Sequence, residues 1–206
     1  MVKIKICGIT KLQDALKAHE FGADFVGFIF FENSPRKIDN ECARCIVEVL
    51  PKGLLKVGLF FNQDLKKVKD TAKMCHLDVL QLHGDETPDY CERLKKYFKI
   101  IKAFKVKDAS SIEATDHYDS VDYYLFDTYA KGIPGGTGKS FNWDILEGRD
   151  FRKPIFLAGG LTPKNVAKAI KKVAPYAVDV ASGVEKSPGK KDYRLLKEFI
   201  DNAKKA

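Results

Sequence analysis

The sequence predicts an α/β protein in which eight parallel strands close into a (β/α)8 barrel. Eight short apolar segments alternate with amphipathic segments along the 206 residues, as strands alternate with helices. Successive apolar segments begin about 21 to 32 residues apart, the length of one strand–helix unit with its loops. An open sheet would leave edge strands unpaired, and closure removes them. We therefore expect residues 1–206 to form one TIM-barrel domain.

The predicted strands are short and rich in apolar or β-branched residues. They begin near Lys3, Phe25, Leu55, Asp78, Lys99, Asp122, Pro154 and Ala177. The first ends at Cys7, where Gly8 interrupts the alternation of apolar residues with lysines. No glycine-rich dinucleotide fingerprint follows this strand, which argues against the rival arrangement, a doubly wound open sheet.

The predicted helices lie between these strands. Helical patterns cover residues 12–19, 42–49, 65–75, 90–98, 110–118, 143–146, 166–173 and 195–203. We expect the first helix to begin near Lys11 with Thr10 as its cap. Cys42 and Cys45 have the spacing of a redox pair, but they fall within a helical pattern. We therefore expect them on a buried helix face.

The composition favours a globular protein of a reducing compartment. Hydrophobic residues make up 45% of the chain and aromatic residues 11%, which is ordinary for a protein with a sizeable core. The first residues resemble a strand and not a secretory signal, and no apolar run is long enough to span a bilayer. Five cysteines without regular spacing argue against a disulfide framework. We therefore expect a cytoplasmic protein with no membrane partner.

The charge is basic but evenly spread. Lysine and arginine number 36 against 28 acidic residues, giving a net charge of +8. Most lysines alternate with acids at helical positions, as on solvated outer faces. No arginine-rich run or nucleic-acid motif is present. We therefore expect no nucleic-acid partner. A basic enzyme with a small anionic substrate fits the charge equally well, since a positive field speeds the capture of anions.

Polar residues gather where the predicted strands end. The strand ends carry Cys7, Phe30, Phe60 or Phe61, His83, Phe104, Asp127, Gly159-Gly160 and Ser182-Gly183. The carboxyl ends of barrel strands converge on one face, where barrel enzymes have their active sites. Taken alone, Cys7 reads as a small buried hydrophobic residue. Its place among a histidine, an aspartate and two glycine turns favours a functional site.

The two glycine turns follow the seventh and eighth strands. Gly159 and Gly160 lead into a helix, and Ser182 and Gly183 follow the last strand. Glycine allows main-chain N–H groups to approach an anion, and barrels commonly hold phosphate at this position. We therefore expect a phosphate site here.

The remaining candidates are more ambiguous when taken singly. Asp127 precedes a glycine-rich loop, from Thr128 to Ser140, of the kind that closes over a substrate, but it also suits an ordinary turn. Arg36 can bind a carboxylate or a phosphate, or be a solvated surface arginine. His83 can be an acid, a base or a polar wall of a pocket. With Cys7 it makes half of a metal site, but no second pair of ligands follows, so we expect no metal.

Taken together, these motifs resemble the phosphoribosylanthranilate isomerase family, a (β/α)8-barrel family of tryptophan biosynthesis. The resemblance covers essentially the whole chain, in order. It rests on residues 5–10 (KICGIT), 27–36 (from GF to SPR), 81–84 (QLHG), Asp127 before its glycine loop, 158–161 (AGGL) and 179–185 (DVASGVE).

The resemblance implies an Amadori rearrangement of N-(5-phosphoribosyl)anthranilate to 1-(2-carboxyphenylamino)-1-deoxyribulose 5-phosphate. In the family, the residue that matches Asp127 is the general acid and the residue that matches Cys7 is the general base. Ring opening gives an iminium ion that makes the sugar C2 proton acidic. Because the substrate is its own electron sink, we expect neither a metal nor an organic cofactor.

The resemblance also implies how the substrate is held. Its carboxylate would meet the arginine that matches Arg36, and its phosphate would meet the glycine turns. The substrate-binding residues that we expect are Arg36, His83, Gly159, Gly160, Asp179, Ser182 and Gly183. An aromatic residue such as Phe30 or Phe61 would line the anthranilate ring. The sequence leaves the choice between monomer and homodimer open.

Three other functions compete with this interpretation. An isomerase of histidine synthesis, another phosphate-binding barrel, would use paired aspartates at the ends of the first and fifth strands. Those positions carry Cys7 and Phe104 here. A basic nucleic-acid-binding module would need clustered lysine and arginine with exposed aromatic residues. A scaffold would leave the polar strand ends without a purpose.

Overall fold

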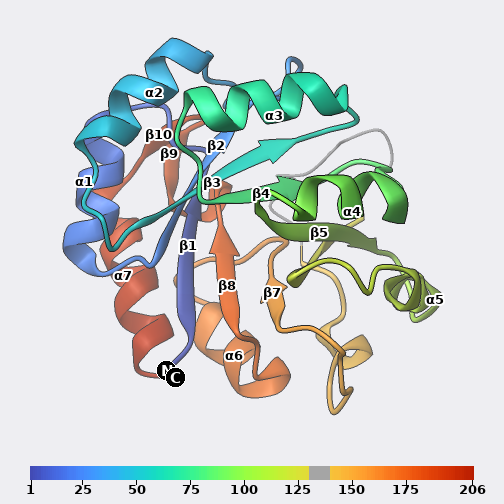
Figure 1. The fold of residues 1–206 in the computed structure, drawn as a ribbon. Helices are drawn as coiled ribbons and strands as arrows, with labels where there is room; N and C mark the ends of the chain where they lie inside the picture. Colours follow the sequence, from blue (N-terminus) through green and yellow to red (C-terminus); the bar gives the residue numbers. More distant parts are fainter. Residues whose placement is uncertain (130–139) are drawn as a thin grey trace.

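The predicted closed barrel is confirmed. A computed structural model describes residues 1–129 and 140–206. Eight parallel strands pair in sequence order, and the last pairs with the first. They are β1 (Lys3–Cys7), β2 (Phe25–Ile29), β3 (Leu55–Phe60), β4 (Val79–Leu82), β5 (Lys99–Val106), β6 (Tyr123–Thr128), β7 (Ile155–Leu157) and β8 (Ala177–Val180). Both termini lie at the end of the molecule where β1 starts (Figure 1).

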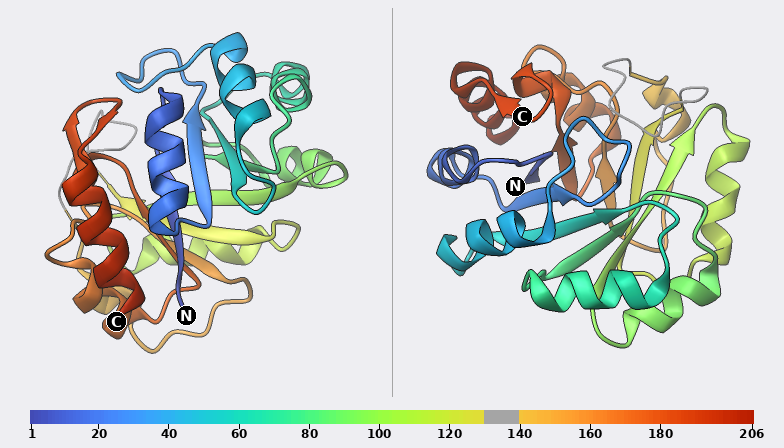
Figure 2. Two further views of the ribbon diagram at one scale, coloured as in Figure 1. Left: turned by 90° about the vertical axis from the view of Figure 1, so that its left-hand side faces the viewer. Right: turned by 90° about the horizontal axis from the view of Figure 1, so that it is seen from above.

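Helices surround the barrel on the outside (Figure 2). The longer ones are α1 (Leu12–Phe21), α2 (Asn40–Val49), α3 (Leu65–Met74), α4 (Pro88–Lys95), α6 (Val166–Val173) and α7 (Tyr193–Lys204). Side chains of Asp39, Asp64, Thr87 and Asp192 accept main-chain N–H groups at four helix starts, where such groups lack intrahelical partners. Among the helices described, none is long and apolar enough to cross a membrane.

Two predicted helices are shorter than expected. The segment 110–118 divides into α5 (Ser110–Glu113) and a 3-10 helix, η1 (Ala114–His117). The segment 143–146 is a 3-10 helix, η2 (Trp143–Ile145). An unpredicted hairpin of β9 (Glu185–Ser187) and β10 (Lys190–Lys191) follows β8, after a 3-10 turn η3 (Ser182–Val184).

Two expectations about local structure were wrong. Thr10 does not cap α1, since its Oγ1 donates to the carbonyl oxygen of Gly189, 2.5 Å away. Cys42 and Cys45 lie in α2 as expected, but both are exposed. The buried face of this helix carries Ala43, Ile46 and Val47 instead. The sequence pattern therefore assigned the buried face to the wrong side of the helix.

The barrel interior is filled near the amino ends of the strands. One cluster of buried side chains comes from β2 to β8 and includes Phe25, Val57, Ile101 and Phe156. A larger cluster packs the outer side of the strands against the helices. The interior cluster forms a floor, so open space in the barrel lies towards the carboxyl ends of the strands.

Candidate active site

A cavity of about 360 Å³ lies at the carboxyl ends of the strands. Among the residues predicted for the site, those lining it are Cys7, Arg36, His83, Asp127, Gly159, Gly160, Asp179 and Ser182. Gly183 is the exception, because it packs behind the wall against the segment after β7. The structure therefore brings together residues that lie as far apart in the sequence as Cys7 and Ser182.

Cys7 lies above a buried ion pair. Its thiol is on the last residue of β1, and the residue is 4% exposed. Lys5, two residues earlier on the same strand, places its Nζ 2.9 Å from Asp179 Oδ2 on the neighbouring β8. Gly27 of β2 leaves room here, since a Cβ at this position would lie 2.8 Å from the Cys7 sulfur and 3.3 Å from Lys5 Nζ.

The charges around Cys7 oppose one another. Burial raises the pKa of the Cys7 thiol, Lys5 counteracts this effect, and Asp179 adds to it. Burial also opposes the charge of Lys5, but Asp179 and the Cys7 thiol outweigh it and raise the pKa of that lysine. Lys5 therefore stays positively charged beside the thiol and stabilises its thiolate form.

Asp127 is held by two donors. It lies near the end of β6 and is 8% exposed. Its Oδ1 accepts the main-chain N–H of Thr128 at 2.7 Å, and its Oδ2 lies 3.2 Å from His83 Nε2. His83 therefore contacts the predicted acid directly, besides lining the cavity.

Gln81 sets the orientation of His83. Its amide Nε2 lies 2.9 Å from His83 Nδ1, and Gln81 is 1% exposed. With the amide nitrogen donating, Nδ1 accepts, and the imidazole proton stands on Nε2, facing Asp127. Gln81 lies in β4, and His83 follows the strand directly, one on each side of the buried Leu82. Side chains two residues apart on an extended chain share a face, so both point into the cavity.

Arg36 reaches the cavity from the loop after β2. Glu185, which begins β9, accepts from Arg36 Nε at 3.1 and 3.0 Å and from Nη2 at 2.8 Å. The side chains of Arg36 and Glu185 are only 10% and 3% exposed. Gly8, directly after β1, has a φ of +75°, and a Cβ there would lie 2.7 Å from Arg36 Cδ. Glycine at this position therefore leaves room for the arginine side chain.

The two glycine turns pack against each other. Gly159 has a φ of +81°, and a Cβ there would overlap Thr128 and lie 3.0 Å from Asp127 Oδ1. A Cβ on Gly183 would overlap the carbonyl oxygen of Leu161. The turns after β7 and β8 therefore approach as closely as only glycine permits, and they bring main-chain groups to one edge of the cavity.

Aromatic residues form the opposite wall. Phe31 and Phe61 line the cavity with ring centroids 4.8 Å apart. Of the two aromatic residues expected beside the anthranilate ring, Phe61 lines the cavity and Phe30 does not, because Phe30 stacks on Phe60 with centroids 5.3 Å apart. The glycine-rich loop predicted to cover the site falls mostly on residues 130–139, which lie outside the described residues.

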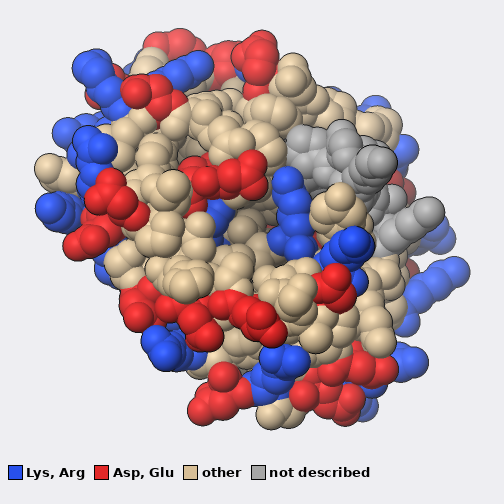
Figure 3. Space-filling model, turned by 90° about the vertical axis from the view of Figure 1, so that its right-hand side faces the viewer, with Lys and Arg blue, Asp and Glu red and all other residues tan. Residues whose placement is uncertain are grey.

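The surroundings of the site carry mixed charge. On the face drawn in Figure 3, lysine and arginine side chains alternate with aspartate and glutamate, with no continuous basic surface. Within the described ranges 1–129 and 140–206, no group of three histidine, cysteine or carboxylate side chains is arranged to hold a metal ion.

Sequence reasoning missed three polar residues of the site. Gln81, Glu185 and Lys191 are 5% exposed or less at their side chains and contact His83, Arg36 and Cys7 respectively. For Gln81, the signal was present, since it lies two residues before His83 on one face of a strand. For Glu185 and Lys191 it was not, because their partners are 149 and 184 residues away.

Comparison with known proteins identifies the family. A family model described as N-(5'-phosphoribosyl)anthranilate (PRA) isomerase matches residues 4–202. The chain belongs to this family. A phosphoribosylanthranilate isomerase from Geobacter sulfurreducens is 50% identical over 204 residues, covering 99% of each chain.

Solved structures agree with this assignment to the phosphoribosylanthranilate isomerases. The enzyme from Thermotoga maritima superimposes with a TM-score of 0.94 at 42% identity, with both chains covered completely. A second isomerase structure, in complex with reduced 1-(o-carboxyphenylamino)-1-deoxyribulose 5-phosphate, has a TM-score of 0.88 at 41% identity, again over both chains. The resemblance seen in the sequence is confirmed.

Proposed function

We propose that this cavity rearranges N-(5'-phosphoribosyl)anthranilate to 1-(2-carboxyphenylamino)-1-deoxyribulose 5-phosphate, with Asp127 as general acid and Cys7 as general base. As a member of its family, the chain is an isomerase of tryptophan biosynthesis. One observation supports the roles most directly. A thiol, a carboxyl, a guanidinium and main-chain groups of the glycine turns line one cavity.

The first step opens the furanose ring. Asp127 gives a proton to the ring oxygen as the bond between this oxygen and the sugar C1 breaks, and the anilino nitrogen supplies the electron pair that forms the iminium ion. His83 Nε2 and the Thr128 N–H hold the carboxyl in place. They also stabilise the carboxylate that remains, since both are donors.

The second step removes the proton from the sugar C2. The Cys7 thiolate takes this proton, and the electron pair moves into the iminium group to give an enolamine. The positive charge of Lys5 stabilises the thiolate form of Cys7. The enolamine then tautomerises to the ketone, so the product is an isomer of the substrate and no electrons are gained or lost.

Binding at both ends positions the sugar between the acid and the base. The free edge of the Arg36 guanidinium is suited to the anthranilate carboxylate, and Phe31 and Phe61 are suited to its ring. The turns at Gly159-Gly160 and Ser182-Gly183 are suited to the phosphate. Asp179 Oδ1 is buried and has no hydrogen-bond partner among the described residues, so it is free to accept a ribose hydroxyl.

The test follows the loss of substrate fluorescence with freshly made phosphoribosylanthranilate. We expect rapid turnover by the wild type and a fall in kcat of about 10²-fold or more in both Cys7→Ala and Asp127→Ala. Cys91→Ala is the matched control, because Cys91 is equally buried but lies in α4, away from the cavity.

The outcomes separate the parts of the proposal. Wild-type turnover that survives in Cys7→Ala would remove Cys7 as the base and direct attention to His83. Absence of wild-type turnover would contradict the activity itself and indicate a different sugar phosphate.

The setting of the enzyme is also a proposal. All five cysteines are free, as is usual in a reducing cytoplasm, and we place the protein there. For the oligomeric state we propose either a monomer or a homodimer. Sedimentation at several concentrations would decide between these two states.

A further inference from the structure

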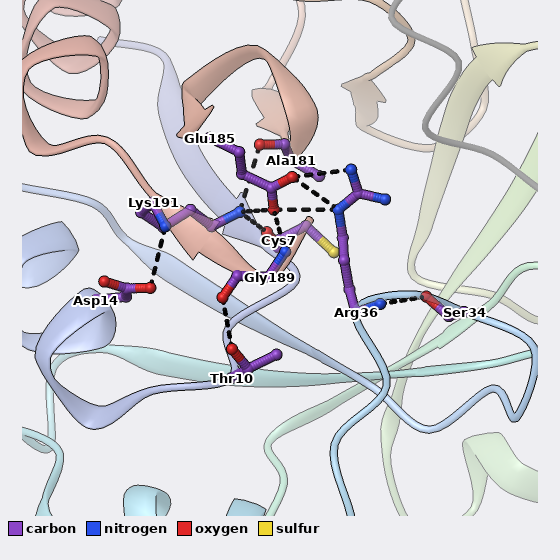
Figure 4. Close-up of polar contacts among 9 residues, drawn as sticks. All are labelled: Cys7, Thr10, Asp14, Ser34, Arg36, Ala181, Glu185, Gly189 and Lys191. Atoms are coloured by element: carbon purple, nitrogen blue, oxygen red, sulfur yellow. Dashed lines mark hydrogen bonds and ion pairs between the residues drawn. The ribbon is translucent and has the colours of Figure 1, made fainter. Parts of the chain in front are cut away.

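A buried lysine lies behind the cavity wall. Lys191, on β10, is 3% exposed, and it is absent from the residues that line the cavity. Its Nζ donates to the carbonyl oxygen of Cys7 at 2.5 Å and to that of Ala181 at 3.3 Å, and it pairs with Glu185 Oε1 at 2.8 Å (Figure 4). One ammonium group therefore joins the ends of β1 and β8 to the hairpin.

Glu185 carries this connection on to Arg36. The carboxylate lies between Lys191 and the guanidinium, and it binds Nε and Nη2 of the arginine (Figure 4). Burial opposes the charge of Glu185, but Arg36 and Lys191 outweigh it and hold the pKa of the carboxyl below its ordinary value. The Glu185 carboxylate fixes one edge of the guanidinium and leaves Nη1 for a ligand.

The hairpin that carries Lys191 is itself anchored. The main-chain N–H of Lys191 donates to Asp14 Oδ2 on α1 at 3.1 Å, and Thr10 Oγ1 donates to the carbonyl oxygen of Gly189. Gly189 also donates its N–H to Glu185 Oε1 at 3.3 Å. These contacts explain why Thr10 does not cap its helix. They also hold the backbone of Lys191 in place.

We propose that Lys191 is a positioning residue that ties the strand end bearing Cys7 to the Glu185–Arg36 pair, so that the proton-abstracting thiol and the carboxylate-binding guanidinium keep a fixed spacing. This inference deepens the proposed function and rests on it. Neither Lys191 nor Glu185 lines the cavity, so both act through their neighbours.

A buried lysine at this place also affects the thiol. Burial lowers the pKa of Lys191 below its ordinary value, while Glu185 and Cys7 favour its charged form. The charged groups that face Cys7 are Lys5 on the same strand, Asp179 on β8 and Lys191 on β10. Lys5 and Lys191 lower the pKa of the thiol, while burial and Asp179 raise it. Loss of Lys191 therefore moves the ionisation of Cys7 to higher pH, which a purely structural residue would not do.

The test compares two buried lysines of the same kind. Lys191→Met removes the cation and its donors while keeping a side chain of similar length. Lys102→Met is the matched control, because Lys102 is 2% exposed, pairs with Glu86 at 2.9 Å and donates to the carbonyl oxygen of Gly84. It does not line the cavity. Glu185→Gln tests the arginine side of the connection alone.

Two readouts are measured for each variant. The first is KM and kcat for phosphoribosylanthranilate. The second is the pH midpoint of Cys7 alkylation by iodoacetamide, located by mass spectrometry on the tryptic peptide from Ile6 to Lys11. This second readout needs no turnover.

We expect Lys191→Met to raise KM roughly tenfold, to lower kcat and to move the alkylation midpoint up by about one pH unit. Glu185→Gln should raise KM most, and Lys102→Met should change neither readout. Wild-type KM and an unmoved midpoint in a folded Lys191→Met would overturn the inference, as would equal shifts in Lys102→Met. If the wild type does not turn over, the proposed function fails, and the midpoint alone still decides whether Lys191 acts on Cys7.

Discussion

At the scale of single residues, Lys5 and Asp179 act on Cys7 in opposite directions. The lysine lowers the pKa of the thiol and the aspartate raises it. We expect Lys5→Met to move Cys7 ionisation to higher pH. We expect Asp179→Asn to move it to lower pH, because the thiolate then becomes the only counterion of a buried lysine. The ultraviolet absorbance of the thiolate at about 240 nm, followed as a function of pH, measures both shifts.

The matching background for this measurement is Cys7→Ser. Subtracting its titration removes the signals of the other cysteines and the tyrosines. Shifts of the same sign in Lys5→Met and Asp179→Asn would show that burial, and not charge, governs the thiol. The pair thus separates the two causes that act on the proposed base.

At the scale of elements, three aspartates link the amino ends of neighbouring strands by hydrogen bonds. Asp24, Asp78 and Asp122 each stand one residue before an even-numbered strand. They accept the main-chain N–H groups of Ile4, Lys56 and Ile100, at 2.9, 2.7 and 2.8 Å. The same contact recurs three times along the chain, so the β1–β2, β3–β4 and β5–β6 units are each closed at the face opposite the site.

Removing one of these hydrogen bonds should lower the stability of the fold without affecting catalysis. Asp78→Ala leaves the Lys56 N–H without its acceptor, and we expect a loss of about 1–2 kcal/mol in the free energy of unfolding. In thermal unfolding this is a fall of a few degrees in Tm. Asp78→Asn keeps an acceptor oxygen and should lose less. An equal loss in Asp78→Asn and Asp78→Ala would assign the stability to the ion pair with Lys56, because both substitutions remove the charge.

The turns after β7 and β8 act as one element at the other face. A methyl group on Gly183 would meet the Leu161 carbonyl oxygen, so Gly183→Ala must push the turns apart. We expect KM to rise about tenfold or more and inhibition by inorganic phosphate to weaken in parallel. Gly53→Ala is the control, since a Cβ there meets nothing within 4 Å. Unchanged phosphate inhibition in Gly183→Ala would place the anion elsewhere.

At the scale of the whole molecule, the positions of the strands were predictable from the sequence, but individual long-range side-chain contacts were not. The strands begin within one residue of the predicted positions, because apolar periodicity reports burial directly. The exposed faces of Cys42 and Cys45 were not predicted, since a small residue fits either side of a short helix. The Lys191–Glu185–Arg36 connection leaves no local pattern, because the hairpin that carries Lys191 and Glu185 meets the loop that carries Arg36 only after the barrel has closed.

The net charge of +8 also acts at this scale. The proposed substrate carries a phosphate and a carboxylate, so a positive field should draw it towards the protein. Raising the ionic strength from about 0.01 M to about 0.15 M shortens the Debye length from roughly 30 Å to roughly 8 Å. We expect kcat/KM to fall about threefold or more over this range while kcat stays constant, since screening affects capture and not the bound state. Stopped-flow capture of substrate against added potassium chloride measures the effect. The interspersed acids on the face in Figure 3 limit its size, and a salt-independent kcat/KM would show that the local groups, Arg36 and the glycine turns, attract the substrate without help from the net charge.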